Sequence, residues 1–199
     1  MRLMDTGKTL WTALATALTF VAFWPYIRGI LRGGVRPHVF SWVIWGITTT
    51  VVFFAQLQAG GGVGAWATGV SGAITFFIAL LAFLKRGDLV VTRTDWAFFL
   101  AALSSLPLWY LTADPTWAVV VLTTVDLLGF GPTLRQVYTR PHSESALFYG
   151  LFLVRNAVSI PALETFSLAT LLFPIVIGLA CGALVGLLLW RRRVVSSTA

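Results

Sequence analysis

The chain has 199 residues, of which 58% are hydrophobic, 14% aromatic and 11% charged, and its mean hydropathy is +0.87. Soluble domains carry about 25% charged residues, so this composition excludes a disordered chain and an ordinary cytosolic enzyme. A lone cysteine, Cys181, excludes an internal disulfide framework. The formal charge of +7 comes from basic residues at the ends of apolar segments, which membrane topology explains better than nucleic-acid binding.

The sequence therefore predicts an all-α integral membrane protein with seven transmembrane helices. A helix needs roughly 20 apolar residues to cross roughly 30 Å of hydrocarbon. Segments of that kind lie, in chain order, at 9–27, 39–57, 63–84, 96–113, 115–134, 145–163 and 166–190. The shortest connection is Asp114-Pro115. Without that break the chain would have six spans, and its C-terminus would lie on the other side of the membrane.

The basic residues predict the orientation, because cytoplasmic connections carry an excess of Lys and Arg. One face of the membrane carries most of the basic residues and is expected to be cytoplasmic, whereas the opposite face holds only Arg2 and Lys8. The N-terminus is therefore expected outside and the C-terminus in the cytoplasm. We expect a multi-pass protein of the cell (inner) membrane that contacts the lipid bilayer and does not bind nucleic acid. The cytoplasmic face holds Arg28, Arg32, Arg36, Lys85, Arg86, Arg93, Arg135, Arg140 and 191–193.

An internal repeat divides the predicted helices. The segment 25–28 (Pro-Tyr-Ile-Arg) recurs at 132–135 (Pro-Thr-Leu-Arg), and Arg-Pro-His at 36–38 recurs at 140–142. Chance similarity between two apolar stretches would not reproduce this order at the same topological point. The sequence thus predicts three helices in 1–87, a linker helix in 88–113 and three helices in 114–199. An even number of spans separates corresponding helices, so the two bundles are parallel, which is a transporter architecture.

Small residues recur at every fourth position in the last helix of each predicted bundle. Such stripes let helix backbones approach closely where lipid supplies no hydrophobic drive between helices. We therefore expect tight helix contacts along both stripes. Their members are Gly64, Thr68 and Gly72 in the first bundle and Gly178, Gly182 and Gly186 in the second.

This 3+1+3 plan, with a proline near the inner end of the first helix of each bundle, resembles the SWEET and PQ-loop transporter superfamily. The PQ dipeptide would fall at Pro25-Tyr26 and Pro132-Thr133, and neither copy has the glutamine. The paired asparagines of the sugar transporters are also absent, since the only asparagine is Asn156. The resemblance implies the fold and small-solute transport in a bacterial-type branch, without implying sugar as the substrate.

Two ionisable residues lie inside predicted spans, Asp126 in the fifth and Arg155 in the sixth. At 1.5 Å per residue they lie roughly 17 Å and roughly 15 Å from the inner end, near the midplane. Such groups are costly unless they pair or face water. We expect the two to lie close together, directly or through Asn156 or water. They would act either as a structural ion pair or as part of a substrate or proton site.

Aromatic residues and prolines supply the remaining candidates. Trp45 and Tyr149 are related by the repeat and lie about two turns into their helices, so they are candidate contacts for a ring-shaped solute. Most other tryptophans lie near helix ends and are interpreted as interfacial anchors. A hinge or gate is expected at Pro25 and Pro132, beside the basic residues Arg28 and Arg135.

We conclude from the sequence that the chain is a transporter that alternates access between its two bundles for a small polar or aromatic solute. A receptor of the same superfamily, resembling the KDEL receptor and binding without net transport, is the alternative. An enzyme is not expected, because no metal cluster, Ser–His arrangement or pair of carboxylates at one depth is present. Neither a cofactor nor a metal is expected, and the sequence is compatible with a homo-oligomer.

Overall fold

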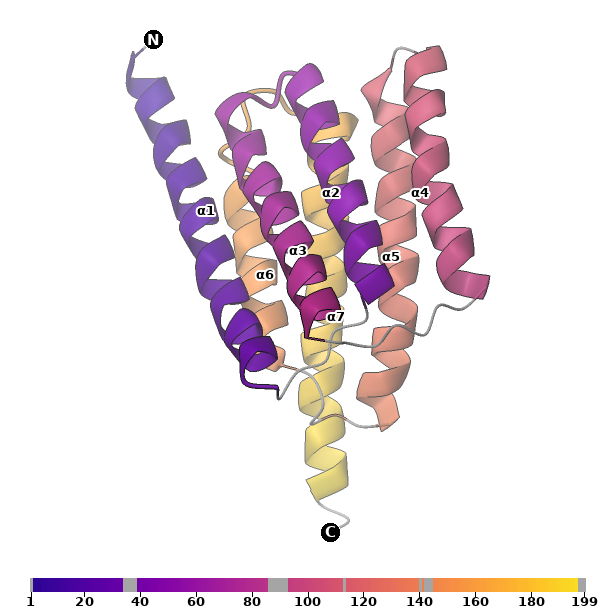
Figure 1. Cartoon of the computed structure of the whole chain (residues 1–199). Coiled ribbons are helices and arrows are strands. Elements are labelled where there is room, and N and C mark those ends of the chain that lie inside the picture. Colours follow the sequence, from indigo (N-terminus) through magenta and orange to yellow (C-terminus); the bar gives the residue numbers. More distant parts are fainter. Residues whose placement is uncertain are drawn as a thin grey trace.

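The computed structural model (Figure 1) describes residues 2–33, 39–85, 93–112, 114–139, 141 and 145–196. These residues form seven α-helices and one short 3₁₀ turn, and no strand occurs among them. The elements are α1 (Arg2–Leu31), α2 (Val39–Gln58), η1 (Gly62–Ala65), α3 (Trp66–Leu84), α4 (Arg93–Thr112), α5 (Pro115–Thr139), α6 (Ala146–Ser159) and α7 (Leu168–Ser196). The all-helical prediction and the number of helices are confirmed.

The predicted break at Asp114-Pro115 is present, and its local chemistry explains it. The Thr116 amide donates to Asp114 Oδ1 at 2.8 Å, and this donation holds the pKa of the exposed Asp114 carboxyl below its usual value. Asp114 thus caps the N-terminus of α5, while Pro115 occupies the first helical position, where a missing N–H costs nothing.

Several helix boundaries differ from those predicted. α1 begins earlier, at Arg2, and α1, α5 and α7 end later than predicted, at Leu31, Thr139 and Ser196. α6 ends early, at Ser159. Pro161 follows two residues later and has no N–H with which to continue the helix.

Three helices are long and apolar enough to cross a membrane, over Thr6–Leu31, Gly62–Leu84 and Leu168–Val195. Trp42–Gln58, Pro115–Phe130 and Ala146–Ser159 are shorter apolar helices. Many large apolar side chains face outward. They include the predicted anchors Trp24, Trp66, Trp96, Trp117 and Trp190, which are 52–65% exposed. Water-soluble monomers rarely expose large apolar patches, so the three long helices and this surface indicate an integral membrane protein.

The helices pack in a regular order, and successive helices run in opposite directions (Figure 1). α3 packs against both α1 and α2, and α7 packs against both α5 and α6. α1 also packs against α6, α2 packs against α5, and α4 lies against α5 and α2. We name the two ends of this bundle the distal end, which holds the N-terminus, and the basic end, which holds Arg28, Lys85, Arg93 and Arg191.

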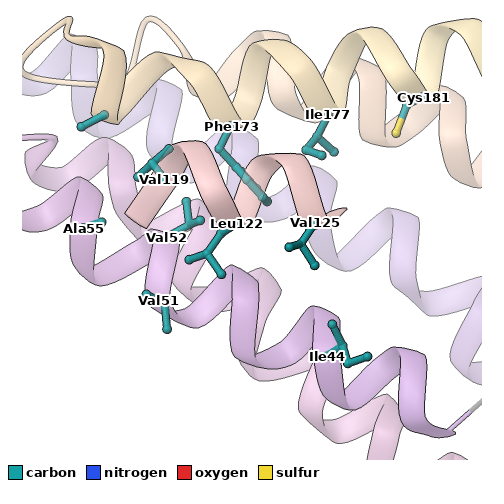
Figure 2. Packing of buried hydrophobic residues seen from close by; sticks show 11 residues of the cluster. Ile44, Val51, Val52, Ala55, Val119, Leu122, Val125, Phe173, Ile177 and Cys181 are labelled. Atoms are coloured by element: carbon teal, nitrogen blue, oxygen red, sulfur yellow. The ribbon is translucent and has the colours of Figure 1, made fainter. Parts of the chain in front are cut away.

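The largest apolar cluster lies between α2, α5 and α7 (Figure 2). Val52 and Ala55 of α2 meet Val119 and Leu122 of α5, and all four are fully buried. Lipid is itself apolar, so contacts of this kind stabilise helix association through close packing rather than through the hydrophobic effect.

The small-residue stripes bring helices together as predicted at three of the six positions. A Cβ added at Gly72 would lie 2.9 Å from Thr50 Oγ1 of α2. A Cβ at Gly178 or Gly182 would lie 3.3 Å from Asn156 or 3.5 Å from Leu153, both on α6. Gly64 also allows a close backbone approach, although to Ala162 in the connection between α6 and α7 and not to a helix, whereas Gly186 has open space beside it. The prediction is therefore wrong at Gly186.

Candidate functional site

Arg155 is buried on α6, where it is 1% exposed and forms a polar contact with α1. Its Nε donates to Thr19 Oγ1 at 3.1 Å, and its Nη1 donates to Asn156 Oδ1 at 2.9 Å. Thr19 Oγ1 in turn donates a hydrogen bond to the Ala15 carbonyl at 2.8 Å, and Asn156 Nδ2 donates to the Phe152 carbonyl at 2.8 Å. Arg155 Nη2 has no hydrogen-bond partner among the described residues, although a buried donor without a partner costs about 1–3 kcal/mol or more.

Asp126 is buried on α5, where it is 6% exposed and forms the matching contact with α2. Its Oδ1 lies 2.7 Å from Thr48 Oγ1, which also lies 3.0 Å from the Trp45 carbonyl oxygen. The buried hydroxyl of Thr123, one turn earlier on α5, has no hydrogen-bond partner. The carboxyl group of Asp126 is therefore held by a single hydroxyl, in a polar patch enclosed by apolar side chains.

The expected direct pairing of Asp126 with Arg155 is wrong. Both side chains are described, and no ion pair joins them; Asp126 bonds to Thr48 and Arg155 bonds to Thr19 and Asn156. Equal depth on consecutive helices does not give a direct contact here, because α7 packs against both α5 and α6. Each charge instead faces a helix from the other half of the chain.

Asn156 is 1% exposed and takes the predicted place beside Arg155. Its side-chain oxygen accepts from the guanidinium, and its side-chain amide donates to the Phe152 carbonyl in the backbone of α6. Gly178 of α7 leaves room for it, since a Cβ there would lie 3.3 Å from the Asn156 Cβ. The buried thiol of Cys181, also on α7, lies within electrostatic reach of Arg155.

Trp45 and Tyr149 are half-buried and pack in an aromatic cluster formed by α1, α2 and α6. The Trp42 and Trp45 rings lie edge to face at 5.5 Å, and those of Phe148 and Tyr149 do so at 5.2 Å. Tyr26 of α1 joins these two pairs, with its ring 5.1 Å from Trp42 and 5.3 Å from Phe148. The two candidate rings therefore belong to one cluster.

The predicted hinge is described in part. Pro25 and Arg28 lie on α1 and are both exposed. Pro132 and Arg135 lie within α5, but their side chains fall outside the described residues. Neither proline ends its helix. Among the described side chains, no group of three or more could hold a metal ion.

Sequence reasoning missed the threonines and the contacts at the distal end. The repeat could have pointed to Thr19, because it aligns with Asp126, but no sequence signal singles out Thr48. The Glu164 amide donates to the Gly61 carbonyl at 3.1 Å, and Glu164 Oε1 accepts from the Val63 amide at 3.3 Å. Lys8 Nζ donates to the Glu164 carbonyl at 3.2 Å. These bonds join the α2–α3 and α6–α7 connections.

A buried glutamine adds one more bond between the two halves. Gln56 of α2 is 1% exposed, and its Nε2 donates to the Thr170 carbonyl of α7 at 3.0 Å. The Thr170 side chain closes the start of α7, since its Oγ1 accepts from the Ser167 amide at 2.9 Å. The two halves are therefore joined by polar bonds both at the distal end and at the level of the buried charges.

No model of a known protein family matches this chain, and no curated protein or solved structure matches it either.

Proposed function

We propose that the chain is a small-solute membrane transporter, in which a first bundle (α1–α3) and a second bundle (α5–α7), joined by α4, alternate access to a site between them. The packing order supports this division. α3 lies against α1 and α2 as α7 lies against α5 and α6, and the contact of α1 with α6 has its counterpart in that of α5 with α2. Exchanging the two bundles therefore maps these contacts onto one another, whereas the contact of α2 with α7 and those of α4 with α5 and α2 are not mapped in this way.

The observation that carries the proposal is the pair of polar contacts between the bundles. Arg155 of the second bundle bonds to Thr19 of the first, and Asp126 of the second bonds to Thr48 of the first. The repeat relates one member of each contact, because Thr19 aligns with Asp126, whereas Thr48 aligns with Phe152, one turn before Arg155. Ionisable groups inside a membrane protein most often mark a pathway for a substrate or an ion.

Contacts at the level of the buried ionisable groups differ within and between the bundles. Within the bundles, Gly72 packs closely on Thr50, and Gly178 packs closely on Asn156. Between the bundles, each ionisable group is held through a threonine hydroxyl, and a hydroxyl bond can be exchanged for a bond to a solute or to water. At the distal end the bundles also meet closely, at Gly64 and Ala162, so alternating access requires this contact to open.

The described basic residues support the proposed orientation, with the N-terminus outside and the C-terminus in the cytoplasm. Arg28, Lys85 and Arg93 lie at the same end as Arg191, 192 and 193, which follow the last apolar turn of α7. Short connections that are rich in Lys and Arg face the cytoplasm in membrane proteins, so we assign the basic end to the cytoplasm. The seven helices then cross the cell membrane in alternate directions.

The test locks the bundles together at the distal end. A Cβ added at Gly60 would lie 3.5 Å from the Thr165 Cβ and 2.9 Å from its Oγ1, which is within the Cβ–Cβ range of a disulfide, although the cysteine would adopt the φ of +78° that Gly60 has. We expect Gly60→Cys/Thr165→Cys, in a Cys181→Ala background, to lose solute uptake into proteoliposomes on oxidation and to regain it on reduction. Radiolabelled glucose, tryptophan and benzoate are the probes, as a neutral sugar, an aromatic amino acid and an aromatic carboxylate.

A disulfide inside the first bundle is the matched control. A Cβ added at Gly72 lies 2.9 Å from Thr50 Oγ1, the same distance as in the locked pair. Thr50→Cys/Gly72→Cys should therefore cross-link equally well and keep its uptake, because both residues belong to one rigid unit. Unchanged uptake by the oxidised Gly60→Cys/Thr165→Cys protein would contradict alternating access between these bundles.

A further inference from the structure

Arg155 carries a buried positive charge that no described carboxyl group neutralises. Both of its partners, Thr19 and Asn156, are neutral, and neither can accept a proton from it. A guanidinium keeps its proton in proteins, so this side chain stays charged at 1% exposure. Buried charges are normally paired or bound to an ion.

The guanidinium also has bonding capacity that the protein does not use. Nε and Nη1 each have a protein acceptor, while Nη2 is buried without one. Thr19 and Asn156 hold the other two nitrogens and so fix the plane of the group. An anion that reached Nη2 would meet a donor already oriented, and the planar fork of Arg matches a carboxylate better than it matches a spherical ion.

The site occurs once, because the repeat does not reproduce it. Val51 aligns with Arg155, is 9% exposed, and packs in the apolar cluster between α2, α5 and α7. The other buried ionisable residue, Asp126, is an acid held by Thr48, so it offers no positive charge to an anion. Among the described side chains, one buried positive group thus lies at the α1–α6 interface, and none lies at the α2–α5 interface.

We propose that Arg155 binds the carboxylate of a small organic monoanion at the α1–α6 interface, and that this carboxylate belongs to the solute that the chain carries. The assignment of the carboxylate to a transported solute rests on the proposed function. The binding itself does not, and it is tested without any flux. Thr19 and Asn156 position the guanidinium, and the carboxylate accepts from Nη2.

Binding is measured as the shift of the unfolding temperature of the purified full-length chain in lipid nanodiscs, because a ligand of the folded state stabilises it by mass action. The probes are benzoate and lactate, each compared with its neutral amide, benzamide or lactamide, and with chloride at equal ionic strength. We expect a saturable rise with at least one carboxylate and none with its amide. An equal rise with chloride, or no saturable rise with either carboxylate, would overturn the proposal.

Asn156→Asp is the decisive variant. It is nearly isosteric, and it places a carboxylate oxygen where Asn156 Oδ1 already lies 2.9 Å from Nη1, so it neutralises Arg155 internally. We expect this variant to unfold at a higher temperature than the natural chain and to bind benzoate about 10- to 100-fold more weakly, the loss expected for a bond to a charged group. Undiminished benzoate binding by a folded Asn156→Asp chain would refute the site.

Two further variants complete the test. Arg155→Lys keeps the charge without the fork and should bind benzoate more weakly than the natural chain does. Gly186→Ala, where an added Cβ has open space beside it, should keep the benzoate response. Benzoate binding by Arg155→Lys as strong as that of the natural chain would place the anion elsewhere.

The outcomes for binding and for transport are distinguishable. Benzoate binding that depends on Arg155, without uptake of benzoate into proteoliposomes, would retain the anion site and reject the transporter. Uptake of glucose or tryptophan that the Gly60→Cys/Thr165→Cys disulfide blocks, without carboxylate binding, would retain the transporter and reject the anion site.

Discussion

Thr19→Val should destabilise the protein only while Arg155 is present. Valine has nearly the shape of threonine but no oxygen, so the change removes the acceptor that lies 3.1 Å from Arg155 Nε. Hydrogen bonds to charged groups contribute about 1.5–3 kcal/mol, and the donor left behind would be fully buried. We therefore expect Thr19→Val to lower the free energy of unfolding by about 1.5–3 kcal/mol.

In an Arg155→Met background the same change should cost much less. Thr19 then loses only its bond to the Ala15 carbonyl, an acceptor that lies in the same helix and is worth little to stability. A cost of about 0.5 kcal/mol or less gives a coupling energy of about 1 kcal/mol or more between Thr19 and Arg155. Reversible unfolding of the purified chain in mixed micelles, followed by tryptophan fluorescence, measures all four proteins of the cycle.

A second cycle, between Asp126→Asn and Arg155→Met, is the control. The two side chains share no partner and form no ion pair, so their effects should add to within about 0.5 kcal/mol. Additive effects of Thr19 and Arg155, or strong coupling of Asp126 with Arg155, would show that the two contacts between the bundles are wrongly described.

Three other predictions follow from the ends of the helices and from the glycines. Gly64→Ala should cost about 1–3 kcal/mol of stability through overpacking, because its Cβ would lie 2.5 Å from the Ala162 backbone. Gly186→Ala, with open space beside it, should cost less than about 0.5 kcal/mol. Equal losses of stability in thermal unfolding would refute this prediction. The pKa of Asp114 is lowered in the folded chain, so its carboxylate stabilises the fold above pH 3.8 and loses this effect as the pH falls through the folded-state pKa. In Asp114→Asn the amide oxygen still caps α5 but does not titrate. The unfolding temperature of this variant should therefore fall less at acid pH than that of the natural chain does. A cysteine added before Arg2 should react with an impermeant maleimide from outside the cell and one added after Ala199 should not; the reverse pattern would invert the proposed orientation.

The sequence by itself determined the helices and most of their ends. Long apolar segments, the cap at Asp114-Pro115 and the glycines at 60–62 are local signals, because a helix needs only its own backbone bonds and a suitable start and stop. Gly60 and Gly62 indeed have φ of +78° and +58° at the end of α2, a conformation that side chains rarely adopt. The sequence also identified Asp126, Arg155 and Asn156, because a polar residue is conspicuous in an apolar segment.

Only the tertiary structure decided which groups these residues meet. Depth along a helix can be counted from the sequence, but the direction of a side chain around the helix axis depends on which helices pack together. Here α7 contacts both α5 and α6, so the two charges that lie at one depth turn to opposite partners, Asp126 to Thr48 and Arg155 to Thr19. A threonine gives no signal in sequence because it is common in apolar helices, and its hydroxyl gains importance only when folding buries it against a charge.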